Sequence, residues 1–190
     1  MEETKAIIEA IIFASESPLT IDKIREVLNE IDRSEIVSLV QELINEYKDR
    51  RGGFLLQEVA GGLHFRTRSD LSLWINKLMK VKQSMLTNAA METLAVVAYK
   101  QPVVKSEIDR IRGVDVGSSL KGLLEKKLVR IMGRKDVPGK PIMYGTTKKF
   151  LEIFSLKDLS ELPTLKELTD LQDRTDDPGL ESQMPDDEEI

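Results

Sequence analysis

The chain has 190 residues, of which 41% are hydrophobic, and a formal net charge of −5 at pH 7. This length suffices for one or two small domains with ordinary apolar cores, and no apolar run approaches the roughly 20 residues that span a bilayer. With no cysteine and one histidine, the composition excludes disulfides, thiol nucleophiles and the usual zinc sites. The N-terminal MEETKAII opens with acids where a signal peptide carries bases, so we expect a cytoplasmic protein.

Charge is distributed unevenly along the chain. Residues 1–86 contain 12 basic and 14 acidic residues, residues 87–155 contain 13 and 7, and residues 156–190 contain 3 and 12. The three net charges are therefore −2, +6 and −9. A basic segment is followed by an acidic tail, and the run DRTDDPGLESQMPDDEEI at its end has the high charge and low apolar content of disordered segments.

The first half predicts three helices, a hairpin and a fourth helix. The stretches AIIEAIIFA, TIDKIREVLNEI and DRSEIVSLVQELINEYKDR place apolar residues three and four positions apart, as on one face of a helix. FLLQEVAGGLHFRT then gives two extended runs around Gly61 and Gly62, a pair that suits a tight turn. DLSLWINKLMK closes the half with a further helical pattern.

The second half repeats this order. TNAAMETLAVVAYK, VVKSEIDRIRG and DVGSSLKGLLEKK predict helices, and the extended runs LVRIMGR and PIMYGTT flank the stretch GRKDVPGKP. A phosphate-binding loop has four residues between its first glycine and its Gly-Lys pair, and a Ser or Thr follows the lysine. In this stretch five residues separate Gly133 from Gly139, and Pro141 follows Lys140. The stretch is therefore interpreted as a turn between two strands.

This order of elements predicts an α+β, mainly helical fold of two tandem winged-helix domains, each with three helices and a small β-hairpin wing. The two halves align at an offset of 84 residues, which pairs Pro18 with Pro102, Ala14 with Ala98 and Ile24 with Ile108. The predicted divisions are a first domain (1–80), a linker (81–86), a second domain (87–155), an extension or short docked helices (156–172) and a disordered acidic tail (173–190).

No pattern in the sequence predicts catalysis. The single histidine, His64, falls in an alternating run, LHFRT, where it shares a face with Arg66 and is expected to be solvated. One imidazole without clustered partners makes neither a triad nor a metal site. We therefore expect no catalytic residue, no cofactor and no metal.

Basic residues of the second half allow two interpretations. The third helix, Asp115 to Lys127, occupies the position that enters the major groove in helix-turn-helix proteins, so Lys121, Lys126, Lys127 and Lys135 are candidate DNA contacts. Alternatively, these lysines only form a polar face that is exposed to solvent. The helix contains no Asn or Gln, so base-specific recognition is not expected.

Apolar residues exceed what one small core needs in AIIEAIIFA and in LAVVAY, residues 94–99. Each stretch lies either in the middle of its own three-helix core or at an interface with another chain. The sequence alone leaves both alternatives open.

The run METLAVVAYKQPVVKSEIDRIRGVDVGSSLKGLLEKKLVRIMGRKDVPGKPIMYGTTKKFLEIF resembles the segregation and condensation protein B family. The first half matches more loosely, so the resemblance covers about residues 5–170. It implies tandem winged-helix domains and a homodimer without enzymatic activity, associated with the nucleoid in the cytoplasm and acting in chromosome condensation and partition during cell division.

The resemblance also implies partners. The dimer would bind the central segment of the kleisin, segregation and condensation protein A, which bridges the heads of the SMC ATPase. The protein would contact DNA only indirectly or weakly. No membrane partner is expected. The expected dimer surface comprises Ile7, Ile8, Ile11, Ile12, Phe13, Trp74 and Ile75. The expected kleisin surface comprises Leu94, Val97, Tyr99, Arg134, Val137, Pro138, Lys140 and Tyr144. The alternative function is a winged-helix transcriptional regulator that binds DNA.

Overall fold

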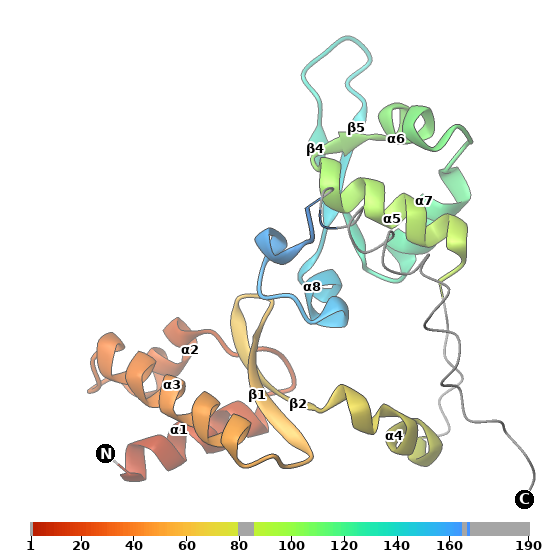
Figure 1. Cartoon of the computed structure of the whole chain (residues 1–190). Helices are drawn as coiled ribbons and strands as arrows, with labels where there is room; N and C mark the ends of the chain where they lie inside the picture. The colour runs from red at the N-terminus through yellow and green to blue at the C-terminus, as the bar shows by residue number, and fades with distance from the viewer. Residues whose placement is uncertain (1, 80–85, 165–166, 168–190) are drawn as a thin grey trace, which may run out of the picture. The chain divides into compact units, whose positions relative to one another are not determined.

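The computed structural model describes residues 2–79, 86–164 and 167 (Figure 1). It combines helices with small antiparallel sheets. Contacts along the chain group it into two compact units, Met1–Leu159 and Ser160–Ile190. The linker predicted at 81–86 and the acidic tail at 173–190 lie almost entirely outside the described residues, so both remain predictions, as do the domain limits.

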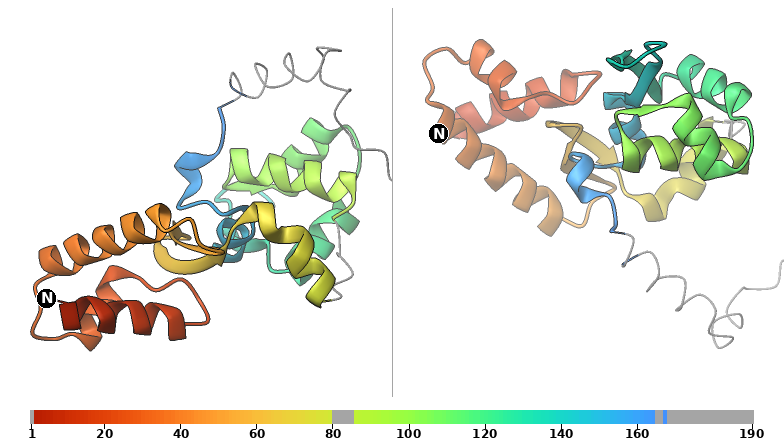
Figure 2. Two further views of the ribbon diagram at one scale, coloured as in Figure 1. Left: turned by 60° about the horizontal axis from the view of Figure 1, so that its bottom comes forward. Right: turned by 90° about the horizontal axis from the view of Figure 1, so that it is seen from above.

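The first half follows the predicted order of elements. Its elements are α1 (Glu2–Ala14), α2 (Ile21–Val27), α3 (Arg33–Asp49), β1 (Phe54–Val59), β2 (Gly62–Thr67), the short 3₁₀ helix η1 (Ser69–Leu71) and α4 (Ser72–Met79). Helices α1 and α2 pack against α3, and the β1–β2 hairpin contacts both α1 and α3 (Figures 1 and 2). The core between them is formed by Ile8, Ile12, Ile24, Ile36, Leu39, Val40, Leu43, Leu56 and Leu63.

The hairpin turn lies one residue earlier than the sequence suggested. Val59 pairs with Gly62, so Ala60 and Gly61 form the turn, with φ angles of 53° and 74°. Gly62 begins β2, and a Cβ atom on it would stand 2.7 Å from the carbonyl carbon of Pro18. This close approach lets Leu19 exchange backbone hydrogen bonds of 2.9 and 2.8 Å with Leu63.

The second half repeats the first and adds the short strand β3. Its elements are α5 (Asn88–Lys100), β3 (Val103–Val104), α6 (Lys105–Arg112), α7 (Gly117–Glu125), β4 (Val129–Arg134), β5 (Ile142–Thr146) and α8 (Lys148–Phe154). The pattern did not predict β3 or α8. Helix α5 packs against α6 and α7, and the three strands form a sheet in the order β3-β5-β4 (Figure 1).

The offset of 84 residues is visible in the backbone pairing. Leu19 and Val103 are 84 positions apart, and each pairs with the returning strand of the hairpin in its own half, Leu19 with Leu63 and Val103 with Tyr144. Ile24 and Ile108 occupy equivalent places on α2 and α6, and both are fully buried. The two halves therefore share a packing plan as well as an order of elements.

The stretch after α8 contacts the first hairpin. The backbone N–H groups of Ala60 and Gly61 donate to the carbonyls of Leu156 and Lys157 at 2.8 and 2.9 Å. Lys157 also forms an ion pair with Glu58. Residues up to Leu159 belong to the first compact unit. In the predicted extension at 156–172, the described part contains one short 3₁₀ helix, η2 (Leu159–Glu161).

Candidate partner-binding surfaces

The described residues contain no group of three His, Cys, Asp or Glu side chains that could hold a metal ion. Among them, no helix is both long and apolar enough to cross a membrane. His64 lies half-buried on β2, paired across the hairpin with Gln57. The remaining candidate sites are surfaces at which apolar side chains or charges are exposed.

An aromatic cluster of Phe13, Tyr47, Phe54 and Phe65 lies between α1, α3 and the first hairpin. Ring centroids are 4.8 Å apart for Tyr47 and Phe65 and 6.1 Å apart for Phe13 and Phe65, both edge-to-face. The cluster lines a depression of about 280 Å³ together with residues of α1. Phe13 is 73% exposed, so the depression has a large apolar side chain at its edge.

The polar edge of this cluster is fixed by Tyr47. Its hydroxyl donates to the carboxylate of Glu9, and burial together with this bond raises the pKa of Tyr47 to about 12. The hydroxyl therefore stays protonated at neutral pH and remains a donor. The guanidinium of Arg50 lies 6.0 Å from the Tyr47 ring and 5.8 Å from the Phe54 ring, within the distance of cation–π attraction.

The structure corrects part of the expected dimer surface. Ile8 and Ile12 are 0% and 1% exposed because they point from α1 into the core, so a second chain has no access to them. Ile7 and Phe13, on the other side of α1, are exposed, and Ile11 is partly buried against the core. The apolar surplus of α1 is thus divided between the core and the surface.

Helix α4 has no buried residue. Trp74 is 64% exposed, and Ile75 is half-buried. Three further apolar residues of this helix are exposed but are not part of the expected dimer surface: Leu73, Leu78 and Met79. The helical spacing of DLSLWINKLMK predicts the helix, but spacing alone does not tell whether the partner of an apolar face belongs to the same chain.

The expected kleisin surface is corrected in the same way. Leu94 and Val97 are 1% and 0% exposed on the inner face of α5, where they fill the core of the second half. Tyr99 is partly exposed, Arg134, Val137, Pro138 and Lys140 are exposed in and beside the loop between β4 and β5, and Tyr144 is half-buried. The surface residues of this set therefore lie mainly in and beside the loop between β4 and β5.

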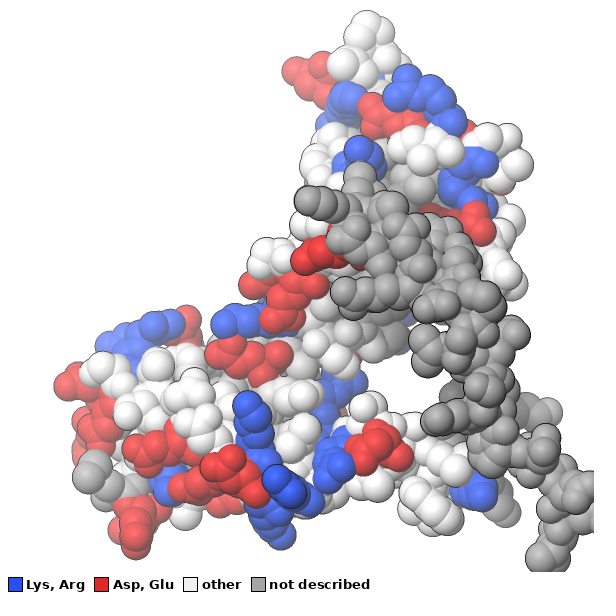
Figure 3. All heavy atoms as spheres, viewed as in Figure 1, with Lys and Arg blue, Asp and Glu red and all other residues white. Residues whose placement is uncertain are grey.

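Two of the candidate DNA contacts are engaged with acids of this chain. Lys135 forms an ion pair of 2.8 Å with Glu107, which holds the pKa of that carboxyl below its usual range. Lys121 lies 4.0 Å from Glu125 along α7. Figure 3 shows basic and acidic side chains interspersed on the face drawn, in contrast to the continuous basic surface typical of DNA-binding domains.

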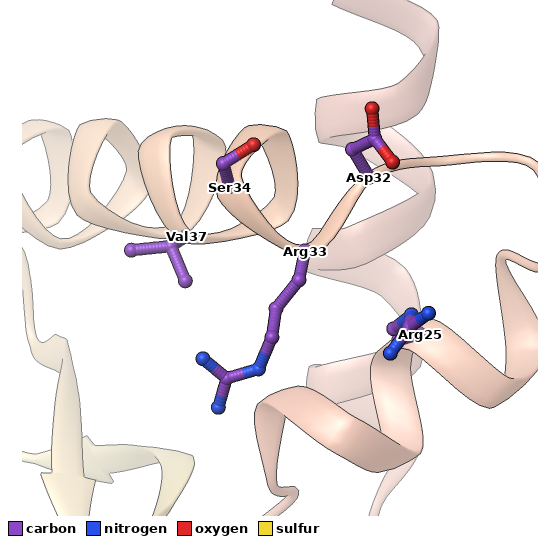
Figure 4. Close-up of a pocket in the computed structure, with 5 residues that line it drawn as sticks. All are labelled: Arg25, Asp32, Arg33, Ser34 and Val37. Atoms are coloured by element: carbon purple, nitrogen blue, oxygen red, sulfur yellow. The ribbon is translucent and has the colours of Figure 1, made fainter.

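A shallow depression of about 610 Å³ lies beside the first turn of α3 (Figure 4). It is lined by Arg25, Asp32, Arg33, Ser34 and Val37. Arg33 and Val37 extend to one side of the turn while Asp32 and Ser34 point to the other, and Arg33 donates to Asp22 at 3.2 Å. Cations, a carboxylate and an apolar side chain mix here, which favours no single class of ligand.

A third depression, which we call the α8 pocket, measures about 540 Å³. It lies between α8, the strands β4 and β5, and the turn that precedes β3. Its lining residues are Gln101, Pro102, Arg130, Met132, Thr146, Thr147, Lys148, Leu151 and Leu159. Sequence reasoning missed this pocket because α8 was not predicted and because its lining comes from four separate segments of the chain.

Comparisons with known proteins point to one family. The family described as "Segregation and condensation complex subunit ScpB" matches residues 6–165. Segregation and condensation protein B of Syntrophotalea carbinolica is 46% identical over 169 residues, which cover 89% of this chain and 85% of the relative. The homolog of Coxiella burnetii is 43% identical over 88% of this chain and 81% of its own length.

Among solved structures, ScpB from Mycobacterium tuberculosis is 30% identical, with a TM-score of 0.39 over 82% of this chain and 96% of that chain. The match over residues 6–165 and the identity across most of both chains are together decisive. This chain belongs to the segregation and condensation complex subunit ScpB family.

Proposed function

We propose that this protein is a non-catalytic subunit of the bacterial SMC condensin complex. In this proposal it acts as a homodimer that binds the central segment of the kleisin ScpA, and it supports chromosome condensation and partition at the nucleoid. Family membership over residues 6–165 is the observation that carries the proposal. The catalytic work of the complex would belong to the SMC ATPase, which this protein reaches through the kleisin.

Each half is proposed to be a winged-helix domain. The second half supports this in detail, because the order α5, β3, α6, α7, β4, β5 places three helices against a three-stranded sheet. The first half has the same order, with the Leu19–Leu63 bridge in the place of the short strand. In both, the turn between the last two strands forms the wing.

The proposed dimer surface combines the exposed side of α1 with α4. It retains Ile7, Ile11, Phe13, Trp74 and Ile75 from the predicted set and omits the two core residues of α1. Large exposed apolar side chains gathered on a helix without any buried residue favour an interface. The proposed kleisin surface retains Tyr99, Arg134, Val137, Pro138, Lys140 and Tyr144.

Calorimetric titration with the ScpA of the same organism tests the proposal. We expect saturable binding by the wild-type protein, and weaker binding by a Val137→Asp variant because a charge at the wing tip cannot be buried against an apolar partner. Asp136→Asn, one residue earlier in the same loop, is the matched control. Absence of any heat or complex between the two folded wild-type proteins would refute the proposal.

A second candidate function, DNA binding by the second half, rests on the lysines at the end of α7. Lys126 and Lys127 follow the helix that occupies the groove-reading position, and both are exposed. The pairing of Lys121 and Lys135 with acids argues against it. Duplex binding that saturates at 150 mM salt and weakens in a Lys126→Ala/Lys127→Ala variant would favour it.

A further inference from the structure

We propose that the α8 pocket is the subsite that holds an extended, acidic segment of the partner chain, with one aliphatic side chain seated in the pocket and a carboxylate at its basic rim. This rests on the proposed function, since it concerns the kleisin partner. None of the residues that line the pocket belongs to the predicted kleisin surface.

The floor and walls of the pocket are apolar. Pro102, Met132, Leu151 and Leu159 line it. Met132 and Leu159 remain 44% and 40% exposed, although their side chains belong to the chemical class that folding normally buries. A volume of about 540 Å³ is ample for a branched aliphatic side chain and its backbone. The pocket thus has both the space and the surface to accept an apolar anchor.

Three polar residues that line the pocket, Gln101, Thr146 and Thr147, already form hydrogen bonds within the chain. The side-chain oxygen of Gln101 accepts from the backbone N–H and the hydroxyl of Thr146 at 2.8 and 3.1 Å, and its amide donates to the carbonyl of Ala98 at 3.1 Å. Thr147 donates to the carbonyl of Lys127 and caps α8. Because these groups are paired with one another or with the backbone, recognition of charge is left to the rim.

Two cations form that rim. Arg130 donates from its Nε to the carbonyl of Thr146 at 3.1 Å, which fixes the guanidinium beside the pocket. Lys148 stands in the first turn of α8. Among the described residues neither cation forms an ion pair, and Glu152, one turn further along α8, forms none with Lys148. The rim therefore carries uncompensated positive charge, which a carboxylate of the partner would complement.

The free edge of strand β4, beside the pocket, is the reason for proposing that the partner's segment is extended. Strand β4 is an edge strand, since its only neighbour in the sheet is β5. The carbonyl of Leu128 accepts from Thr147, which aims the backbone groups of Val129 and Ile131 away from β5. A partner strand can pair there until the bulge between Ile131 and Gly133 ends the regular ladder. Its alternate side chains would then face the pocket.

Two matched pairs of variants test this by titration with full-length ScpA. Lys148 lines the pocket and its neighbour Lys149 does not, so Lys148→Glu is expected to weaken binding about 10-fold and Lys149→Glu less than 3-fold. Met132 lines the pocket and its exposed neighbour Ile131 does not, so Met132→Asp is expected to weaken binding at least about 10-fold relative to Ile131→Asp. Thermal unfolding of each variant confirms that it is folded.

The outcomes separate the two proposals. If the wild-type protein fails to bind ScpA, the proposed function fails. If it binds and both pocket variants bind as their controls do, only the pocket assignment fails.

Photocrosslinking identifies the occupant. With benzoylphenylalanine in place of Met132, we expect crosslinks to an acidic segment of ScpA. Crosslinks confined to a second copy of this chain, or to a basic segment of ScpA, would overturn the assignment.

Discussion

Single side chains join the second and third helices of the second half. Lys105 lies between the carboxylates of Asp109 and Asp115, with its Nζ 2.8 Å from Asp109. Asp109 also accepts from the backbone N–H of Val116 at 2.9 Å, so one carboxylate holds the start of α7 against α6. The bond from Lys105, followed by that from Val116, lowers the pKa of Asp109 below its ordinary 3.8.

This lowered pKa predicts a loss of stability in acid. A carboxyl group whose folded pKa is below its unfolded pKa stabilises the fold above the unfolded value, and this stabilisation disappears as the pH falls through the folded pKa. We therefore expect the free energy of unfolding, measured in urea, to decrease as the pH is lowered below about 4. Asp109→Asn should flatten part of this decline, whereas Asp136→Asn in the loop between β4 and β5 should leave it unchanged. An equal slope in all three proteins would contradict the assignment.

The helix cap at Thr147 gives a second residue-scale prediction. Its hydroxyl oxygen accepts from the N–H of Phe150 at 3.2 Å and its hydroxyl donates to the carbonyl of Lys127 at 2.6 Å. Thr147→Ala removes both bonds and is expected to lower the free energy of unfolding by about 1–2 kcal/mol. Ser118→Ala on the exposed side of α7 serves as the control, with an expected change of at most about 0.5 kcal/mol. Urea unfolding measures both.

At the scale of elements, the repeated helix pair α2 and α6 depends on one isoleucine in each half. Ile24 and Ile108 are both 0% exposed, and the two helices are only 7 and 8 residues long. Helices this short are not stable alone and require tertiary packing. The core contact therefore determines whether each helix forms.

Truncation of the buried isoleucine of α6 should accordingly destabilise the fold. Ile108→Ala is expected to lower the free energy of unfolding by about 2–5 kcal/mol, because the cavity cannot close fully in a small domain. Ile111, three residues later on the same helix, is 50% exposed, and Ile111→Ala should cost less than about 1 kcal/mol. Chemical denaturation of both variants makes the comparison, and similar losses would show that burial at 108 is not what stabilises α6.

Most elements could be predicted because their signals are local. Helical spacing and the alternating runs predicted seven helices, α1 to α7, and both hairpins to within a few residues. Strand β3 was missed because two valines carry no periodicity, and it exists only through pairing with β5. The hairpin turn was misplaced because Ala60 adopts a positive φ that the pattern reserves for glycine.

The candidate surfaces were harder to predict than the fold. Ile7 and Ile8 are neighbours of the same type, yet one is 42% exposed and the other is 0% exposed. Which face of an apolar helix is covered depends on where the other helices pack, and this is a non-local property. For the same reason, Leu94 and Val97 were assigned to a partner although they belong to the core.

At the scale of the whole molecule, the exposed apolar side chains of α4 carry the argument for self-association. Trp74→Asp would place a charge in the proposed interface, so we expect the dimer dissociation constant to rise about 10-fold or more. Asn76→Asp, on the same helix and already polar, should have little effect. Sedimentation equilibrium compares the two, and a dimer of unchanged strength in Trp74→Asp would remove α4 from the interface.

The central claim is that this ScpB-family chain is a homodimeric, kleisin-binding subunit. Light scattering after size exclusion, on the protein alone and mixed with ScpA, tests it most directly. We expect a mass of twice the 21.5 kDa chain for the protein alone, and a heavier peak that contains both proteins in the mixture. A mass of one chain, with ScpA eluting separately in the mixture, would contradict it.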